Sequence, residues 1–193
     1  MTTTKRDHVI ECARELFERE GFHATGVDRI LERAGVAKMT LYNNFGSKER
    51  LIVEVLEESS KAMIERLASF ARKAGPDPYD QILGIFHALG AWYADPEFCG
   101  CMFQAAVAEY PNPDDTVAIA ARAHQERVQD LFSDLCEAAE LADPDSLSRR
   151  LALLASGATC VARQSRSRTP ADDALGVAEV LLERAAHPPT DRG

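Results

Sequence analysis

A helix-start pattern that recurs three times constrains the fold of this chain most. Asp77-Pro78-x-Asp80, Asp143-Pro144-Asp145 and Thr169-Pro170-x-Asp172 each place a capping residue before a proline and an acidic residue. Proline suits the first helical position, where the N–H that it lacks has no partner in the helix, and the acid suits the positive end of the helix dipole. The sequence shows no strand-like alternation bounded by hairpin turns. It therefore predicts an all-α fold.

Further start and stop signals divide the chain into about nine helices. Thr4-x-x-Asp7 and Thr25-x-x-Asp28 resemble capping boxes, Ser47 is a suitable cap, and Gly75 suits a helix end. The expected helices span residues 5–20, 26–34, 38–44, 48–73, 78–94, 98–109, 114–142, 144–167 and 170–187.

The composition is that of an ordinary globular protein. Hydrophobic residues make up 46% of the 193 residues and charged residues 27%, which excludes wholesale disorder. The longest mostly apolar stretch, residues 151–162, has 12 residues, whereas a membrane span needs about 20. The amino terminus lacks the pattern of a secretory signal. With five cysteines, an odd number, we expect reduced thiols in a cytoplasmic protein that has no membrane partner.

The net charge of −9 is unevenly distributed along the chain. Residues 1–50 carry nine basic and eight acidic side chains, whereas the remaining residues carry 13 basic and 23 acidic ones. A nearly neutral amino-terminal part is compatible with a nucleic-acid contact that is confined to this part.

The second and third expected helices form a helix-turn-helix candidate. Val27, Ile30, Leu31 and Ala34 recur at the spacing of one helix face. The tight break Ala34-Gly35-Val36-Ala37 follows them and precedes the third helix. Many small helical hairpins share this pattern, so periodicity alone leaves the function of the pair open.

From Val9 to Leu51 the residues closely resemble the DNA-binding head of the tetracycline-repressor (TetR) family. From residue 52 onward the chain is similar to the family only in its helical layout. The resemblance implies a helix-turn-helix DNA-binding domain over residues 1–47 and a helical effector-binding and dimerisation domain over residues 48–187, and we expect a frayed tail over residues 188–193. The motifs are Ala13-x-x-Leu16-Phe17, Glu20-Gly21-Phe22, Thr25-Gly26-Val27, Ile30 to Gly35-Val36, Thr40-Leu41-Tyr42-x-x-Phe45 and Ser47-Lys48-x-x-Leu51.

The third expected helix suits the part of a recognition helix, which packs on one side and turns polar side chains to the major groove. Leu41 and Phe45 lie one turn apart and are expected to pack inward. The side chains then left outward or at the margin are Met39, Thr40, Tyr42, Asn43 and Asn44.

The resemblance implies which side chains contact DNA. Thr40, Tyr42 and Lys48 match family positions that contact phosphates, and Thr25 lies at a helix terminus that faces the DNA backbone. Asparagine can pair with adenine and methionine can contact a thymine methyl. The groove candidates are therefore Lys38, Met39, Asn43 and Asn44.

Alternatives and departures accompany these assignments. The alternative to a groove contact is that Met39 packs against the protein and that Asn44 is merely solvated. The family often has Ser or Thr where Ala37 stands and a small residue where Met39 stands. Loss of a side-chain cap costs about 1 kcal/mol, so we expect DNA to contribute to the order of this helix.

The resemblance implies a homodimer in which the last two helices of each chain form a four-helix bundle. A dimer is required to contact both half-sites of an operator in double-stranded DNA, which we expect to be palindromic. A core stripe within one chain is the alternative. The apolar residues that recur at spacings of three and four are Leu147, Leu151, Leu154, Ala158 and Val161, followed by Leu175, Ala178, Leu182 and Ala185.

The resemblance also implies a pocket for an unknown small-molecule effector among the middle helices. Such a pocket has apolar walls and a few converging polar groups. Aromatic residues at helical spacing usually form core, and His124 has a hydrogen-bonded core histidine as its alternative. The candidates are His87, Trp92, Tyr93, Phe103, Gln104 and His124.

Two further clusters have structural explanations. Arg163, Arg166 and Arg168 lie at the end of an expected helix, where cations complement the dipole, and an acidic-ligand site is the alternative. Cys99-Gly100-Cys101 has no matching ligands nearby, so reduced thiols are favoured over metal binding or redox sensing. We therefore expect no metal and no cofactor.

Catalytic motifs do not support an enzyme. Glu20-Gly-Phe-His23 is the only Glu-x-x-His, and the chain has no His-Glu-x-x-His, phosphate-binding loop or Gly-x-Ser-x-Gly elbow. We expect a sequence-specific transcriptional regulator, a repressor that an effector releases from its operator. The alternative is a helical protein-interaction adaptor that has lost DNA binding.

Overall fold

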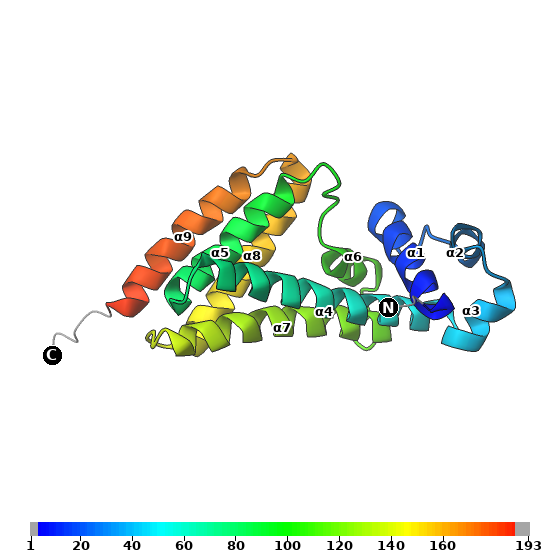
Figure 1. Ribbon diagram of the computed structural model, residues 1–193, viewed down its shortest axis with the longest axis horizontal. Coiled ribbons are helices and arrows are strands. Elements are labelled where there is room, and N and C mark those ends of the chain that lie inside the picture. The colour runs from blue at the N-terminus through cyan, green and yellow to red at the C-terminus, as the bar shows by residue number, and fades with distance from the viewer. Residues whose placement is uncertain (1–3, 188–193) are drawn as a thin grey trace. The chain divides into compact units, whose positions relative to one another are not determined.

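The computed structural model describes residues 4–187, and the regular structure in that range is entirely helical (Figure 1). This confirms the all-α fold and the nine helices for these residues, whereas the tail expected at 188–193 lies outside them. Each helix between residues 4 and 187 is too short or too polar to cross a membrane. The helices are α1 (Lys5–Glu20), α2 (Val27–Ala34), α3 (Lys38–Phe45), α4 (Lys48–Ala74), α5 (Pro78–Tyr93), α6 (Met102–Glu109), α7 (Thr116–Ala138), α8 (Pro144–Ser165) and α9 (Thr169–Ala186).

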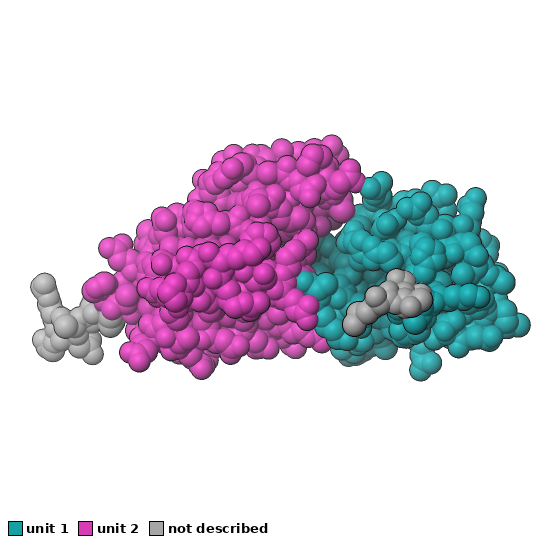
Figure 2. Space-filling model, viewed as in Figure 1, with its two compact units in different colours: residues 1–62, 101–124 teal, residues 63–100, 125–193 magenta. Residues whose placement is uncertain are grey.

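The chain forms two compact units, each made of two segments (Figure 2). Unit 1 contains residues 1–62 and 101–124, and unit 2 contains residues 63–100 and 125–193. The helices α4 and α7 therefore each contribute residues to both units. The domain boundary that the sequence predicts after residue 47 stays a prediction.

Unit 1 packs α1, α2 and α3 with the first part of α4 around one apolar core. The rings of Phe17 and Phe22 lie 5.0 Å apart, and Ile30 and Leu41 are fully buried. Both α6 and the first part of α7 add side chains to the same core. Burial of one such side chain contributes about 1.5–3 kcal/mol, so this core fixes the inner faces of the short helices.

Unit 2 packs α5, α8 and α9 against one another. Phe86 and Phe132 lie at its centre with ring centroids 5.8 Å apart. The hydroxyls of Tyr93 and Thr159 lie 2.6 Å apart, and that of Thr159 also donates to the carbonyl of Ala155. The buried hydroxyls are thus satisfied within the unit, as buried polar groups must be.

Several predicted helix caps are confirmed. The Thr4 hydroxyl accepts the N–H of Asp7, and the Asp7 carboxylate accepts the N–H of Thr4. The hydrogen bond from the Thr4 N–H, followed by an interaction with the Thr4 side chain, holds the pKa of the Asp7 carboxyl below its usual value. The Asp77 carboxylate accepts the N–H of Tyr79 at 2.9 Å, and Pro78 follows it at the first helical position.

Two predicted helix starts are wrong. Thr25 does not cap α2, because its buried hydroxyl donates to the carbonyl of Gly21 at 2.7 Å and Gly26 occupies the N-cap position. Thr169 is the first residue of α9 rather than its cap. The Ser167 hydroxyl accepts the N–H of Thr169 at 3.1 Å and so supplies an acceptor two residues before the predicted cap.

Two helices are shorter than the sequence predicts. The helix expected over residues 98–109 begins only at Met102, because Gly100 adopts a φ of +100°, outside the helical region. The helix expected over residues 114–142 spans only Thr116–Ala138. At the start of α7 the Asp115 carboxylate accepts the N–H of Val117. After the end of α7, Glu140 adopts a φ of 51°, which is outside the helical region.

The apolar stripe that predicts a dimer contact lies mostly inside the chain, so this prediction is wrong for most of its residues. Their place in the core of unit 2 confirms the alternative of a stripe within one chain. The buried members are Leu147, Leu151, Ala158, Ala178 and Leu182. Other apolar side chains of α8 and α9 are exposed instead, together with Val161 of the stripe: Leu153, Val177 and Val180.

Candidate nucleic-acid interface

A tight turn ends α2 and leads into α3. Gly35 adopts the left-handed conformation at a φ of 63°, and its N–H donates to the carbonyl of Glu32. The N–H of Val36 donates to the carbonyl of Leu31 at 3.2 Å. Glycine accepts this φ without the clash that a Cβ causes, so the predicted helix-turn-helix is present over residues 27–45.

The helix α3 has one buried and one exposed side. Leu41 and Phe45 are buried, as predicted, and the guanidinium of Arg6 lies 5.4 Å from the Phe45 ring centroid. On the other side, the side chain of Met39 is 69% exposed and that of Tyr42 is 42% exposed. Packing within the described part of the chain therefore does not account for Met39.

The two asparagines of α3 have different environments although both are exposed. The side-chain amide of Asn44 donates to the carbonyl of Thr40 at 2.6 Å. The side chain of Asn43 makes no hydrogen bond to the part of the chain that the structure describes. Only Asn43 therefore offers its whole amide group to a partner.

The start of α3 has no side-chain cap. Ala37 occupies the N-cap position at φ −74° and ψ 151°, and its carbonyl accepts the N–H of Thr40 at 2.9 Å, but it supplies no side-chain acceptor to the first turn. The first helical residue, Lys38, lies with its ammonium 3.6 Å from the Asp28 carboxylate of α2. The departure at Ala37 thus leaves the start of α3 without the side-chain acceptor that usually caps a helix.

Two basic residues lie in the first turn of α4. Lys48 begins this helix, and the Ser47 hydroxyl accepts the N–H of Arg50 at 3.2 Å, as expected of a cap. Arg50 is exposed and lies beside Gly46, and it is not among the residues that the sequence predicts to contact DNA. The signal was present in the sequence, because the dipole disfavours cations at a helix N-terminus unless an anion binds there.

Thr25 lies apart from this exposed side. Its side chain is fully buried, and its hydroxyl donates to the carbonyl of Gly21. The Thr25 side chain therefore orders the loop before α2 and is not itself accessible to a ligand.

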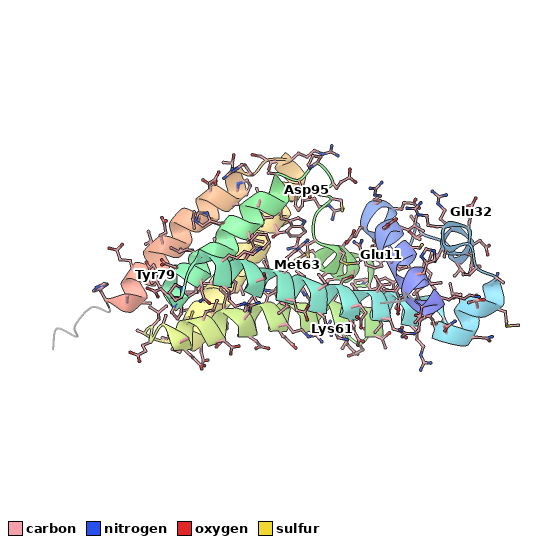
Figure 3. All side chains as sticks on the ribbon, viewed as in Figure 1. Glu11, Glu32, Lys61, Met63, Tyr79 and Asp95 are labelled. Atoms are coloured by element: carbon pink, nitrogen blue, oxygen red, sulfur yellow. The ribbon has the colours of Figure 1, made fainter. Side chains whose placement is uncertain are left out.

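Several arginines of unit 1 are paired with carboxylates. Glu11 of α1 and Glu32 of α2, both labelled in Figure 3, lie 2.5 Å from Arg14 and 3.8 Å from Arg29. The hydrogen bond from Arg14 lowers the pKa of Glu11. A polyanion gains least from cations that are already neutralised, so the basic residues at the start of α4 are the more available ones.

The predicted effector residues fall into separate groups. In unit 1, His124 of α7 stacks on Phe103 of α6 with ring centroids 3.6 Å apart. The Nδ1 atom of His124 lies 2.9 Å from the Ser60 hydroxyl, within hydrogen-bond distance. This arrangement matches the alternative of a hydrogen-bonded core histidine. Gln104 follows Phe103 on α6 and is half-buried.

In unit 2, Trp92 and Tyr93 form an aromatic cluster with Phe98, with ring centroids 5.0 to 5.9 Å apart. His87 is exposed on α5. A cavity of about 180 Å³ in the same unit is lined by other residues. They are Ala142, Asp143, Leu147, Arg150, Leu181, Arg184 and Ala185.

The arginine and cysteine clusters have local contacts. Arg168 pairs with Asp172 at 2.9 Å, and Arg166 follows the end of α8 in the left-handed conformation at a φ of 49°. Cys99 is exposed, whereas burial raises the pKa of the Cys136 thiol to about 11. Within residues 4–187, no three His, Cys, Asp or Glu side chains are grouped so that they could hold a metal ion.

Comparisons with known proteins connect this architecture to a family. Residues 9–55 match the sequence profile described as bacterial regulatory proteins, tetR family. The HTH-type transcriptional activator FasR of Mycolicibacterium smegmatis is 30% identical over 133 residues, which is 67% of this chain and 59% of FasR. The HTH-type transcriptional repressor KstR2 of the same organism is 31% identical over 44% of this chain and 41% of KstR2.

The chain thus spans 59% and 41% of the length of these two curated relatives. The similarity to a solved structure is more extensive. The crystal structure of a TetR-family transcriptional regulator from Streptomyces coelicolor superposes with a TM-score of 0.85 at 29% identity, and the match covers 95% of this chain and 96% of that one.

Proposed function

Because the chain belongs to the TetR family of bacterial regulatory proteins, we propose that it is a sequence-specific DNA-binding regulator of transcription. The exposed side of α3 carries this proposal. Met39, Tyr42 and Asn43 face solvent there, while Leu41 and Phe45 hold the helix to the core of unit 1. A short helix with this division is what the major groove accepts. The proposed role is binding rather than catalysis.

The proposed contacts divide into those that position the protein and those that select sequence. Thr40, Tyr42 and Lys48 contact phosphates, and Arg50 joins them because it extends the same basic turn. At Thr25, the backbone rather than the buried side chain faces the DNA. The groove contacts come from Lys38, Met39 and Asn43, and from the side-chain oxygen of Asn44.

The proposed domains are a helix-turn-helix domain over residues 1–47 and an effector-binding and dimerisation domain over residues 48–187. The start of α4 at Lys48 supports this division, because α1 to α3 are then complete within the first domain. Binding to a chromosomal operator takes place in the cytoplasm of a bacterial cell.

The proposed homodimer forms through the exposed faces of α8 and α9. Leu153 and Val180 are 73% and 63% exposed, and Val161 and Val177 on the same two helices are each 50% exposed, so apolar side chains recur on the exposed faces of these helices. Nothing lies within 4 Å of a Cβ built at Gly157 or at Gly176, so each helix has room for the close approach of a partner. This face replaces the buried stripe as the proposed contact between copies.

The proposed regulation is repression that a small-molecule effector relieves. An effector that binds one conformation better shifts the population toward it, and the affinity for the operator falls if the head separation differs. The name of KstR2 supports a repressor, while that of FasR shows that relatives also include an activator. The effector candidates stay His87, Trp92, Tyr93, Phe103, Gln104 and His124.

A mobility-shift assay on DNA from upstream of the protein's own gene tests this proposal. We expect a retarded complex whose affinity falls steeply between 50 and 200 mM salt, as phosphate contacts require, while a shuffled duplex binds more weakly. A panel of hydrophobic metabolites should contain a compound that releases the complex. Equal, weak binding to both duplexes contradicts the proposal and favours a protein-interaction adaptor.

A further inference from the structure

The carboxylate of Glu109, the last residue of α6, accepts two main-chain hydrogen bonds from a loop 86 residues earlier in the chain. The N–H of Phe22 donates to Oε1 at 3.0 Å, and the N–H of His23 donates to Oε2 at 2.6 Å. Both partners belong to unit 1. Hydrogen bonds to a carboxylate are about twice as strong as those between neutral groups, so this contact is well suited to fix the loop.

Further contacts surround the same carboxylate. The Nε2 atom of His23 lies 2.8 Å from the main-chain carbonyl of Glu109, and the His23 ring lies 4.7 Å from the ring of Tyr110. Gly21 has a φ of 86°, and a Cβ there would lie 3.0 Å from Oε1. Glycine at position 21 accepts this φ without strain, and it leaves Oε1 in a place from which a Cβ would displace it slightly.

The fixed loop leads directly into α2. The Thr25 hydroxyl donates to the carbonyl of Gly21 at 2.7 Å, which closes the loop on itself, and Gly26 then forms the N-cap of α2. Gly26 has no side chain to cap the helix, and the side chain of Thr25 is occupied. The position of this helix end therefore depends on the Glu109 contact and on the core below it.

We propose that Glu109 is a positioning residue for DNA binding, because it holds the loop 21–25 so that the N-terminus of α2 presents its backbone to a phosphate. This role rests on the proposed function, since it assumes that α2 approaches DNA. The carboxylate acts through the loop and does not itself contact DNA.

The charge of Glu109 makes the test discriminating. Removal of a negative charge from a protein that binds a polyanion should strengthen binding or leave it unchanged. A positioning role predicts the opposite for Glu109→Gln, because a glutamine has one acceptor oxygen and leaves one of the two N–H groups unpaired. The matched control is Glu57→Gln, which removes the same charge from an exposed position of α4 in the same unit.

Fluorescence anisotropy with one operator duplex compares the wild type, Glu109→Gln and Glu57→Gln at a temperature at which circular dichroism shows all three folded. We expect Glu109→Gln to bind about tenfold more weakly, as for the loss of one charge-assisted hydrogen bond. We expect Glu57→Gln to bind as tightly as the wild type or more tightly. Equal or tighter binding by Glu109→Gln overturns the proposal.

Hydrogen exchange measures the loop directly. We expect the amides of Phe22 and His23 to exchange at least tenfold faster in Glu109→Gln, while the amides of α3 keep their wild-type rates. Equal acceleration in α3 shows general destabilisation and overturns the positioning role. If Glu109→Gln does not fold, His23→Ala replaces it, with weaker DNA binding expected and unchanged binding contradictory. A wild type that binds no duplex contradicts the proposed function, whereas the exchange experiment still tests the contact itself.

Discussion

The side-chain amide of Asn44 donates to the main-chain carbonyl of Thr40, one turn earlier in α3, at 2.6 Å. Its neighbour Asn43 makes no such bond within the part of the chain that the structure describes. Two adjacent and chemically identical side chains on the proposed recognition helix are therefore in different states. Asn43 can offer both its amide N–H groups and its oxygen to a base edge, whereas one N–H of Asn44 is already used and its side-chain oxygen is not.

We expect Asn43→Ala to relax base preference more than Asn44→Ala does. A bidentate contact with a base contributes about 1–3 kcal/mol of discrimination, so Asn43→Ala should weaken binding to the selected site about tenfold or more while binding to random DNA stays within about twofold. Competition binding measures both affinities. An equal loss of affinity for specific and random DNA would contradict the proposed contact of Asn43 with a base in the groove.

Lys48→Ala should weaken binding to all sequences alike, because a phosphate contact carries no sequence information. The slope of log affinity against log salt should fall by about 0.9, the value for one phosphate contact. The matched control is Lys61→Ala on the same helix, since the Lys61 ammonium lies 2.8 Å from Glu58. An unchanged slope for Lys48→Ala, or the same change for Lys61→Ala, argues against the phosphate contact.

Ala37→Ser should stabilise the protein. A serine at this N-cap supplies a side-chain acceptor for the first turn of α3, and such caps contribute about 1 kcal/mol to the free energy of unfolding. Urea denaturation followed by circular dichroism measures the gain. Ala37→Val, which adds bulk without an acceptor, should show none, and an equal gain in both variants would exclude the capping explanation.

Leu153→Arg and Val180→Asp should each convert the dimer to a monomer, because a charge in the centre of an apolar contact loses its water without gaining a partner. Analytical ultracentrifugation measures the mass. Ile119→Arg, at a side chain of unit 1 that is 50% exposed, is the control and should leave the dimer intact. Dimers that persist in both α8 and α9 variants would place the interface elsewhere.

Local signals in the sequence predicted the fold well. The four-residue spacing of Leu41 and Phe45 correctly predicted the buried side of α3, and the motif Thr4-x-x-Asp7 correctly predicted the first capping box. Both features depend only on residues that are neighbours along the chain. The identical motif at Thr25 failed, because its hydroxyl has a closer acceptor at Gly21.

Contacts between distant segments were not predictable in the same way. The spacing of Leu147 and Leu151 shows that one face of α8 is apolar but does not say whether the partner is α5 or a second chain. The hydrogen bonds of Glu109 join residues 86 and 87 positions apart, and no periodicity marks such a pair. Of the two basic residues in the first turn of α4, the sequence predicts Lys48 as a phosphate contact because it matches a residue of the family motif. It does not predict Arg50, because the motif specifies no residue at that position.

Selection from a pool of random-sequence duplexes at physiological salt tests the central claim most directly. If α3 of each protomer enters the major groove, repeated selection should enrich one motif as two inverted half-sites whose centres lie about 34 Å apart, or slightly more. The Asn43→Ala variant should enrich this motif less. A pool that stays random after repeated rounds with the wild-type protein would contradict the account.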